Sequence, residues 1–310
     1  MNEVKVEQRS YEMPPRQGFA VAHFLTVADL GRSARFYETV FGGQILSGGD
    51  SSGTPGYIQL ANTWLILNVG GGPTPDKPSV TLSVPPDPDR VSSFMNMRVA
   101  DIQASYELWQ SRGAAFITEP KDKYGETRCY IRDPDGYLIE VGETKPDLAF
   151  GRGSDVESGL DEIQVGQKGY ELPPREGFSV AHFLTVADVG RSARFYESVF
   201  EGRILTMGDS IGAPAFIQIA NAWLIVYFGG GPTPDKPSVT LSVPANPDAV
   251  SSFMSIRVAD IRTCYELWRH RGAEFITDPK DKLSETCCYI RDPDGYIIEV
   301  GQSKPGFPYG

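Results

Sequence analysis

The feature of this sequence that most constrains its fold is a long internal repeat that needs no insertion. Residues 11–146 recur as residues 170–305, with each residue 159 positions before its counterpart and most aligned positions identical. The stretch GGGPTPDKPSVTLSV returns unchanged, at 70–84 and again at 229–243. A period of this length is far above that of a solenoid unit, so it indicates two copies of a whole domain.

The repeat predicts two domains joined by a linker. A chain of 310 residues is long enough for two domains that each bury a core. We expect a first domain at 1–149 and a second at 167–310. The segment 150–166 between them is polar, acidic and rich in glycine, as a linker is.

Each copy contains a weaker repeat of a strand, a helix and short strands. In AHFLTVADLGRSARFYETVFGG an alternating strand precedes Asp29, an expected helix N-cap, and the helix ends at glycine. FMNMRVADIQASYELWQSRGA repeats this plan with Asp101 as the cap and Gly113 as the stop. Three short strand patterns follow each helix. The chain therefore reads as four βαβββ modules of the α+β class.

Composition narrows the classes of partner. The formal net charge of −11 argues against nucleic acid and anionic membranes, because both need a basic surface on the protein. No apolar run reaches the roughly 20 residues of a membrane span, and the first ten residues lack the apolar core of a signal peptide. The four cysteines show no disulfide or zinc spacing. We expect a cytoplasmic protein whose partner is a small molecule.

Two motifs carry a resemblance to a known family. V-A-D-L-x-R-S-x-x-F-Y-x-x-V-F-G lies at the first strand and helix of the first copy, and D-P-D-G-Y-x-I-E-V lies at the last strand of each copy. In this order the motifs resemble the glyoxalase/bleomycin-resistance/extradiol-dioxygenase family, also called the vicinal oxygen chelate superfamily. The resemblance implies two cupped mixed sheets, each built from two modules with a site on its concave face. It does not fix the function, because the family includes enzymes and binding proteins.

The resemblance also implies a metal site, which this sequence matches poorly. The family's first-strand histidine falls on Ala22 and Ala181, and its second-module histidine falls on Phe94 and Phe253. Only Glu140 and Glu299 match outright. His23 and His182 lie one residue later, where alternation points them away from the cup unless a β-bulge intervenes. We expect no cofactor or, as the less favoured alternative, one divalent metal per site held by His23, His182, Glu140 and Glu299.

Strand alternation predicts an aromatic and apolar cup with a few polar groups. The catalytic candidates are Glu140 and Glu299 with Tyr130 and Tyr289. The candidate substrate-binding residues are Arg98, Arg257, Phe94, Phe253, Asn96, Ser255, Phe24 and Phe183. The glycine-rich segment 70–78 and its copy lack the lysine-serine ending of a phosphate loop, and we interpret them as connections between modules.

Several functions fit this set of residues. Glu140 could act as a general base with Arg98 as the anchor of an oxyanion, which favours lyase or isomerase chemistry on a small carbonyl, hydroxy-acid or aromatic compound. The same residues could instead form a buried structural ion pair. The alternatives for the whole chain are metal-free sequestration, as in bleomycin resistance, and a metal-dependent dioxygenase. The missing histidines disfavour the dioxygenase.

The sequence leaves the pairing of modules open. Each cup could lie within one copy or combine strands of both copies in an internal pseudo-dimer, within a chain that is monomeric or homodimeric. The two sites also differ, because Asn96 aligns with Ser255 and Arg128 with Cys287. We therefore expect that one site does the main work or that the two differ in ligand preference.

Overall fold

The structure is a computed structural model of the chain. It describes residues 13–50, 53–123, 125–144, 174, 176–208 and 213–307. The expected linker at 150–166 lies outside the described residues.

Each copy contains two modules with the strand, helix and strand order expected from the sequence. In the first copy the elements are β1 (Phe19–Thr26), α1 (Leu30–Phe41), β2 (Gln44–Ser47), β3 (Gly56–Leu60), β4 (Thr63–Asn68), β5 (Thr81–Leu82), β6 (Arg90–Val91), β7 (Ser93–Val99), α2 (Ile102–Ser111), β8 (Ala115–Phe116), β9 (Lys121–Lys123), β10 (Glu126–Arg132) and β11 (Leu138–Thr144).

The second copy repeats this order. Its elements are β12 (Phe178–Thr185), α3 (Val189–Phe200), β13 (Arg203–Thr206), β14 (Ala215–Ile219), β15 (Ala222–Tyr227), β16 (Thr240–Leu241), β17 (Ala249–Val250), β18 (Ser252–Val258), α4 (Ile261–His270), β19 (Glu274–Phe275), β20 (Lys280–Asp281), β21 (Glu285–Arg291) and β22 (Ile297–Ser303).

The helices begin and end where capping chemistry predicts. Asp29 and Asp101 are N-caps, and their side chains accept hydrogen bonds from the backbone N–H groups of Arg32 and Ala104. Gly42 ends α1 with φ 72°, in the left-handed region that glycine adopts without a steric penalty. Both capping predictions are confirmed.

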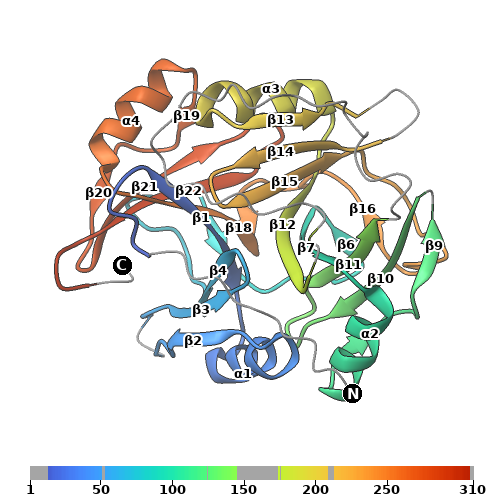
Figure 1. Cartoon of the computed structure of the whole chain (residues 1–310). Coiled ribbons are helices and arrows are strands. Elements are labelled where there is room, and N and C mark those ends of the chain that lie inside the picture. The colour runs from blue at the N-terminus through green and yellow to red at the C-terminus, as the bar shows by residue number, and fades with distance from the viewer. Residues whose placement is uncertain are drawn as a thin grey trace.

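The two large sheets each combine strands from both copies. One sheet has the order β19-β21-β22-β18-β1-β4-β3-β2, and the other has the order β13-β14-β15-β12-β7-β11-β10-β8. Figure 1 shows the blue strands of the first copy running on into the orange and red strands of the second. The first module thus joins the fourth, and the second joins the third. We call the concave face of the first sheet cup 1 and that of the second sheet cup 2.

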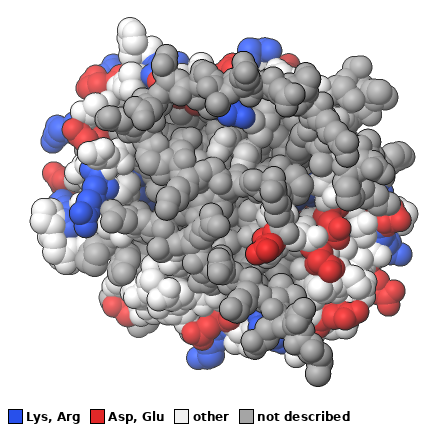
Figure 2. Space-filling view, in the orientation of Figure 1, with Lys and Arg blue, Asp and Glu red and all other residues white. Residues whose placement is uncertain are grey.

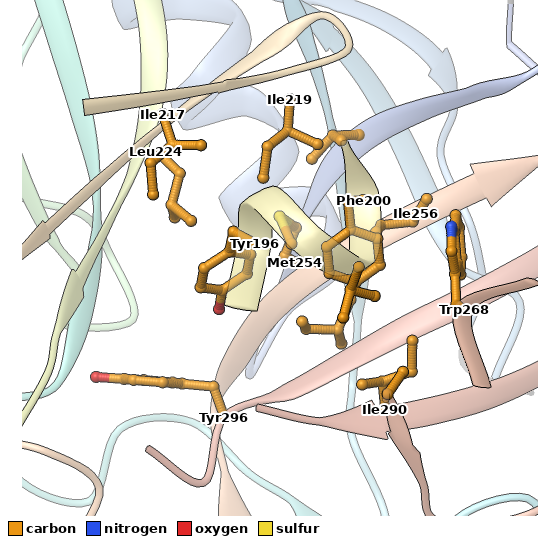
Figure 3. Packing of buried hydrophobic residues seen from close by; sticks show 14 of the residues in the cluster. Tyr196, Phe200, Ile217, Ile219, Leu224, Met254, Ile256, Trp268, Ile290 and Tyr296 are labelled. Atoms are coloured by element: carbon orange, nitrogen blue, oxygen red, sulfur yellow. The ribbon is translucent and has the colours of Figure 1, made fainter. Parts of the chain in front are cut away.

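Hydrophobic cores fill the layer between the sheets and the helices. Figure 3 shows one of them, in which Tyr196 and Phe200 of α3 pack with Trp268 of α4 and with strand residues such as Ile217 and Ile256. The rings of Phe200 and Trp268 meet edge to face at 5.0 Å between centroids. These contacts bury the apolar faces of the helices against the sheets.

Two buried asparagines link the two sheets. Asn62 Nδ2 donates hydrogen bonds to the carbonyl oxygens of Val180 and Asn221, at 3.0 and 2.8 Å. Asn221 Nδ2 donates in turn to Val21 and Asn62, at 2.9 and 2.7 Å. Each asparagine comes from a β-hairpin of one copy and reaches a first strand of the other. The two copies are therefore interlocked twice, through shared sheets and through these amides.

The surface does not present one dominant sign of charge in the view of Figure 2. Basic and acidic side chains are interspersed around the described part of this face. Among the described residues, no helix is long and apolar enough to cross a membrane.

Candidate active site

A row of side chains crosses the floor of each cup. In cup 1 the cross-strand pairs are Ala22 with Ser255, Ser255 with Glu299, and Glu299 with Tyr289. Residues paired across neighbouring strands project from the same face of a sheet, so these four share the concave face. The register of β1 runs without a bulge from Phe19 to Leu25. The equivalent row of cup 2 is Ala181, Asn96, Glu140 and Tyr130.

The glutamate in each row is buried and hydrogen-bonded. Asn96 Nδ2 donates to Glu140 Oε1 at 2.7 Å, and Tyr130 Oη donates to Oε2 at 2.8 Å. In cup 1, Ser255 Oγ and Tyr289 Oη each donate to Glu299 at 2.8 Å. These donors explain how a carboxylate is tolerated in an apolar strand. Burial raises the pKa of Glu140 and of Glu299 above the ordinary value.

An arginine occupies the next row of each cup. Arg98 Nη1 lies 3.8 Å from Glu140 Oε1, while its Nη2 donates to Glu126 at 2.8 Å. Arg257 Nη1 donates to Glu285 at 2.7 Å. Both arginines are at most 5% exposed, and the Nε–H group of each is buried without a hydrogen-bond partner. Each cup therefore holds one buried N–H donor that no described protein group satisfies.

A glycine makes room for each arginine. A Cβ atom on Gly142 would lie 2.3 Å from Arg98 Nη1, and one on Gly301 would lie 2.4 Å from Arg257 Nη1. These glycines follow the glutamates by two residues on the same face of β11 and β22. The sequence analysis did not identify these glycines as part of the site. The signal that could have done so is the I-E-V-G pattern, in which the glycine follows the glutamate by two residues and therefore shares its face of the strand.

Aromatic and apolar side chains line both cups, as the alternation pattern predicts. Phe24 stacks on Phe253 at 4.1 Å between ring centroids, and Phe94 stacks on Phe183 at 4.2 Å. The clusters that contain them also include Trp64 in cup 1 and Trp223 in cup 2, both nearly fully buried. The walls are therefore apolar, with polar groups concentrated in the rows of the glutamates and arginines.

The loops 70–78 and 229–237 close over the cups, which the sequence interpretation did not foresee. We call them loop 1 and loop 2. Asp76 of loop 1 lies 2.9 Å from Lys282, and its carbonyl oxygen accepts a hydrogen bond from Thr277 at 2.9 Å. Asp235 of loop 2 accepts a hydrogen bond from Arg128 Nε at 2.6 Å. The sequence feature that could have indicated a role for these loops is the unchanged recurrence of the fifteen-residue segment that includes them.

The histidines His23 and His182 lie away from the cups. His23 pairs across the sheet with Met254, on the opposite face from Ser255 and Glu299. The two imidazoles stack at 3.2 Å between centroids beside a cavity of about 30 Å³ that residues of both sheets line. Their Nε2 atoms are buried without partners, and burial lowers the pKa of His182 to about 3. The imidazoles therefore stay neutral.

The donor groups present fit a catalytic divalent metal poorly. Among the described residues, one group of three could offer ligand atoms within 4.8 Å of one another, and it consists of Glu285, Cys287 and Glu299. Arg257 and Lys282 already neutralise Glu285, at 2.7 and 3.6 Å. Burial raises the pKa of the Cys287 thiol, which opposes the thiolate that a metal needs. No histidine belongs to this group, whereas catalytic transition-metal sites usually include imidazole.

The fold and the two cups define the class of protein. A family model described as the Glyoxalase/Bleomycin resistance protein/Dioxygenase superfamily matches residues 20–141 and again 179–300. The chain belongs to this superfamily, in a tandem form with two glyoxalase-like repeats, and both the resemblance and the α+β fold expected from the sequence are confirmed. The domain boundaries at 149 and 167 stay a prediction.

Solved structures share the fold across nearly the whole chain. Glyoxalase I from Zea mays superposes with a TM-score of 0.55 at 16% identity, over 92% of this chain and 93% of that chain. A putative dioxygenase from Bacillus subtilis gives a TM-score of 0.52 at 11% identity, over 96% and 88%. At these identities the likeness shows the fold alone. A search of curated proteins returned no match.

Proposed function

We propose that the chain is a metal-independent enzyme that removes a proton from the carbon beside a carbonyl group in a small organic molecule. The observation that carries this proposal is the pair of a buried glutamate and a tyrosine hydroxyl at 2.8 Å, present in both cups. An enolate-forming lyase or isomerase needs a base, a proton donor and a group that holds the developing negative charge. Each cup supplies all three.

The glutamate is suited to the role of base. Burial raises its pKa, which makes the ionised form more basic than an exposed carboxylate. In the proposed step a carboxylate oxygen takes the proton, and the electrons of the C–H bond form the C=C bond of an enolate. The carbonyl oxygen of the substrate takes the negative charge.

The arginine and the tyrosine complete the set. The free Nε–H of Arg98 or Arg257 would donate to a carboxylate or to the enolate oxygen of the substrate. Burial also raises the pKa of Tyr130 and of Tyr289, so both phenols keep their protons and act as donors. A substrate reaches the row only after loop 1 or loop 2 moves aside, because both loops contact residues of the cup walls.

The test is hydrogen exchange on phenylpyruvate, which offers an aromatic ring, a carboxylate and an acidic proton beside a carbonyl. In D₂O, proton NMR should show faster loss of the benzylic signal with the protein than in buffer. We expect Glu140→Gln together with Glu299→Gln to abolish the acceleration, and the exposed-residue variant Glu107→Gln to retain it. An acceleration that survives the double substitution would refute the role of the glutamates.

Sequestration of an aromatic molecule is the second candidate. It is favoured by the apolar walls and by the alanines Ala22 and Ala181 at the ends of the rows. Binding of phenylpyruvate, measured by quenching of tryptophan fluorescence, would then survive both glutamine substitutions. Binding without any catalysed exchange would support sequestration over catalysis.

A further inference from the structure

The two cups differ at the position that pairs with the glycine beside the arginine. Arg128 pairs with Gly142 in cup 2, and Cys287 pairs with Gly301 in cup 1. Both side chains lie one row from the glutamates, on the face that the loops cover. Because the chain is duplicated, the effect of arginine and of cysteine at this position can be compared within one protein.

In cup 2 the arginine fastens the loop. Arg128 Nε donates to Asp235 of loop 2 at 2.6 Å, and Nη1 donates to Glu126 at 2.9 Å. Lys123 Nζ lies 3.3 Å from the same aspartate. Two cations of the sheet therefore hold one buried carboxylate of the loop. Although burial raises the pKa of Asp235, Arg128 and the hydrogen bonds hold it down at about 2.

In cup 1 the corresponding attachment is weaker. Lys282 is 2.9 Å from Asp76 of loop 1 but also 3.6 Å from Glu285, so one cation serves two carboxylates. Cys287 Sγ donates to Asp76 at 3.4 Å, and a thiol is a weak donor. Cup 1 thus lacks one guanidinium and its charge-assisted hydrogen bond to the loop aspartate.

Most of the other contacts of the loops are equivalent in the two cups, although the Gly70 N–H of loop 1 also donates to Asn68 Oδ1 at 3.0 Å, where loop 2 follows Tyr227 instead. Loops 1 and 2 have identical sequences. Thr277 and Thr118 bond the aspartate carbonyls of loops 1 and 2 at 2.9 Å in each case. The internal bond from the threonine N–H to the lysine carbonyl is 3.4 Å in both loops. Among the cup-wall side chains that contact the loop aspartates, the residue at position 128 or 287 is therefore the one that differs in type.

The residue at position 128 or 287 also changes the charge around the buried glutamate of its cup. Apart from burial, Arg128 has the largest effect on Glu140 and lowers its pKa, whereas Glu285 has the largest effect on Glu299 and raises its pKa. The negative charge of Glu299 in cup 1 is therefore less neutralised by nearby cations than that of Glu140 in cup 2.

We infer that cup 1 is the working site of this protein, because Arg128 locks loop 2 over cup 2 while Cys287 leaves loop 1 able to open above Glu299. Arg128 and Cys287 are then the residues that set which site takes a substrate. The locking of loop 2 stands on its own, and the assignment of catalysis to Glu299 rests on the proposed function.

Hydrogen–deuterium exchange of the full chain tests the lock without any ligand. Identical loop sequences give identical intrinsic exchange rates, and peptides that extend through Val69 or Phe228 distinguish the loops by mass. We expect loop 1 to exchange about tenfold faster than loop 2, as the loss of one charge-assisted hydrogen bond worth about 1.5 kcal/mol predicts.

Two reciprocal variants make the test specific. Arg128→Cys should raise the exchange of loop 2 to that of loop 1, and Cys287→Arg should slow loop 1 to the rate of loop 2. Each variant installs the residue that the sister cup already has, and a thermal unfolding curve checks that it folds. If Arg128→Cys does not fold, Cys287→Arg and the comparison of loops 1 and 2 in the wild type still test the lock. Equal exchange of the two wild-type loops, or no response to either variant, would overturn the lock.

The phenylpyruvate assay tests the assignment of the working site. Glu299→Gln should remove a larger share of the catalysed exchange than Glu140→Gln. Adding Arg128→Cys to Glu299→Gln should restore part of it, because cup 2 becomes able to open. Equal losses, or a larger loss from Glu140→Gln, would overturn the assignment. Absence of catalysed exchange in the wild type would refute the proposed function, while loop exchange would still decide the lock.

Discussion

At the scale of single residues, the glutamate in an apolar strand is explained by its neighbours across the sheet. Glu140 accepts hydrogen bonds from Asn96 and Tyr130, so its burial leaves both oxygens paired. The arginine beside it depends on a glycine, since Gly142 leaves the space that the guanidinium of Arg98 fills. The order Glu-x-Gly in the last strand is therefore a packing requirement of the site.

Replacing this glycine should disrupt the row of the arginine. In Gly142→Ala the new methyl group would lie 2.3 Å from Arg98 Nη1, so the buried guanidinium, whose Nη2 pairs with Glu126, would have to shift. We expect a loss of about 2 kcal/mol in the free energy of unfolding, measured with urea. Gly72→Ala, whose Cβ meets nothing within 4 Å, is the control. An equal effect of both substitutions would contradict the packing role.

At the scale of elements, the D-P-D-G turn does more than reverse the chain. The turn itself is confirmed, with the Gly136 N–H bonded to the Asp133 carbonyl at 3.1 Å. The side chain of Asp133 also accepts a hydrogen bond from Tyr37 of α1 at 2.8 Å. Tyr137 Oη donates to the carbonyl oxygens of Thr26 and Ser251 at 2.8 and 2.7 Å. The turn thus joins three modules.

These turns should make stability depend on pH. Burial raises the pKa of Asp133 and of Asp292 to about 6, so the native state binds their protons more tightly than the unfolded chain. This contribution is fully present below about pH 4 and is lost as the pH rises through 6, by on the order of 2–3 kcal/mol for each aspartate.

The double variant Asp133→Asn with Asp292→Asn isolates this contribution. Relative to the variant, the wild type should lose stability between pH 4.5 and 7.5 in urea unfolding. Taking the difference removes the contribution of His23 and His182, whose lowered pKa acts in the opposite direction. Parallel curves for the two proteins would rule out the aspartates as the source.

At the scale of the whole molecule, the two copies form one folding unit. Each large sheet draws strands from both copies, so neither sheet exists within one copy. Asn62 and Asn221 add buried hydrogen bonds between the copies. The duplicated sequence therefore behaves as an internal pseudo-dimer whose halves cannot separate without losing both sheets.

One consequence is a single unfolding transition. Differential scanning calorimetry should show one peak with an enthalpy of about 200 kcal/mol, as expected for a chain of this length near 60 °C. The calorimetric and van't Hoff enthalpies should agree. Two resolved transitions would show that the copies unfold independently.

The asparagine link gives a second test at this scale. Asn62→Ala would leave the N–H of Val180 and the carbonyl oxygen of Asn221 without these partners in a buried place. We expect a loss of about 3 kcal/mol in the free energy of unfolding. The exposed Asn246→Ala serves as the matched control. A loss below 1 kcal/mol for Asn62→Ala would show that the link contributes little.

The sequence predicted much of the local structure because local rules decide it. The caps at Asp29 and Asp101, the βαβββ order and the family follow from short-range patterns. Strand alternation also placed Glu140, Asn96 and Arg98 on one face, and the structure brings them together with Tyr130. The same rule directed His23 away from this face, but nothing in the pattern indicated that it stacks on His182.

By itself the sequence determined the modules, the caps and the faces of the strands, because periodicity and capping act over a few residues. Only the tertiary structure decided that the first module joins the fourth and the second joins the third. Pairing of modules within one copy would bury the same strand edges, so the sequence pattern does not distinguish the two arrangements. It also decided that loops 1 and 2 reach the cups, and that Arg128 and Cys287 hold them differently. Those contacts join residues more than a hundred positions apart, where no local pattern acts.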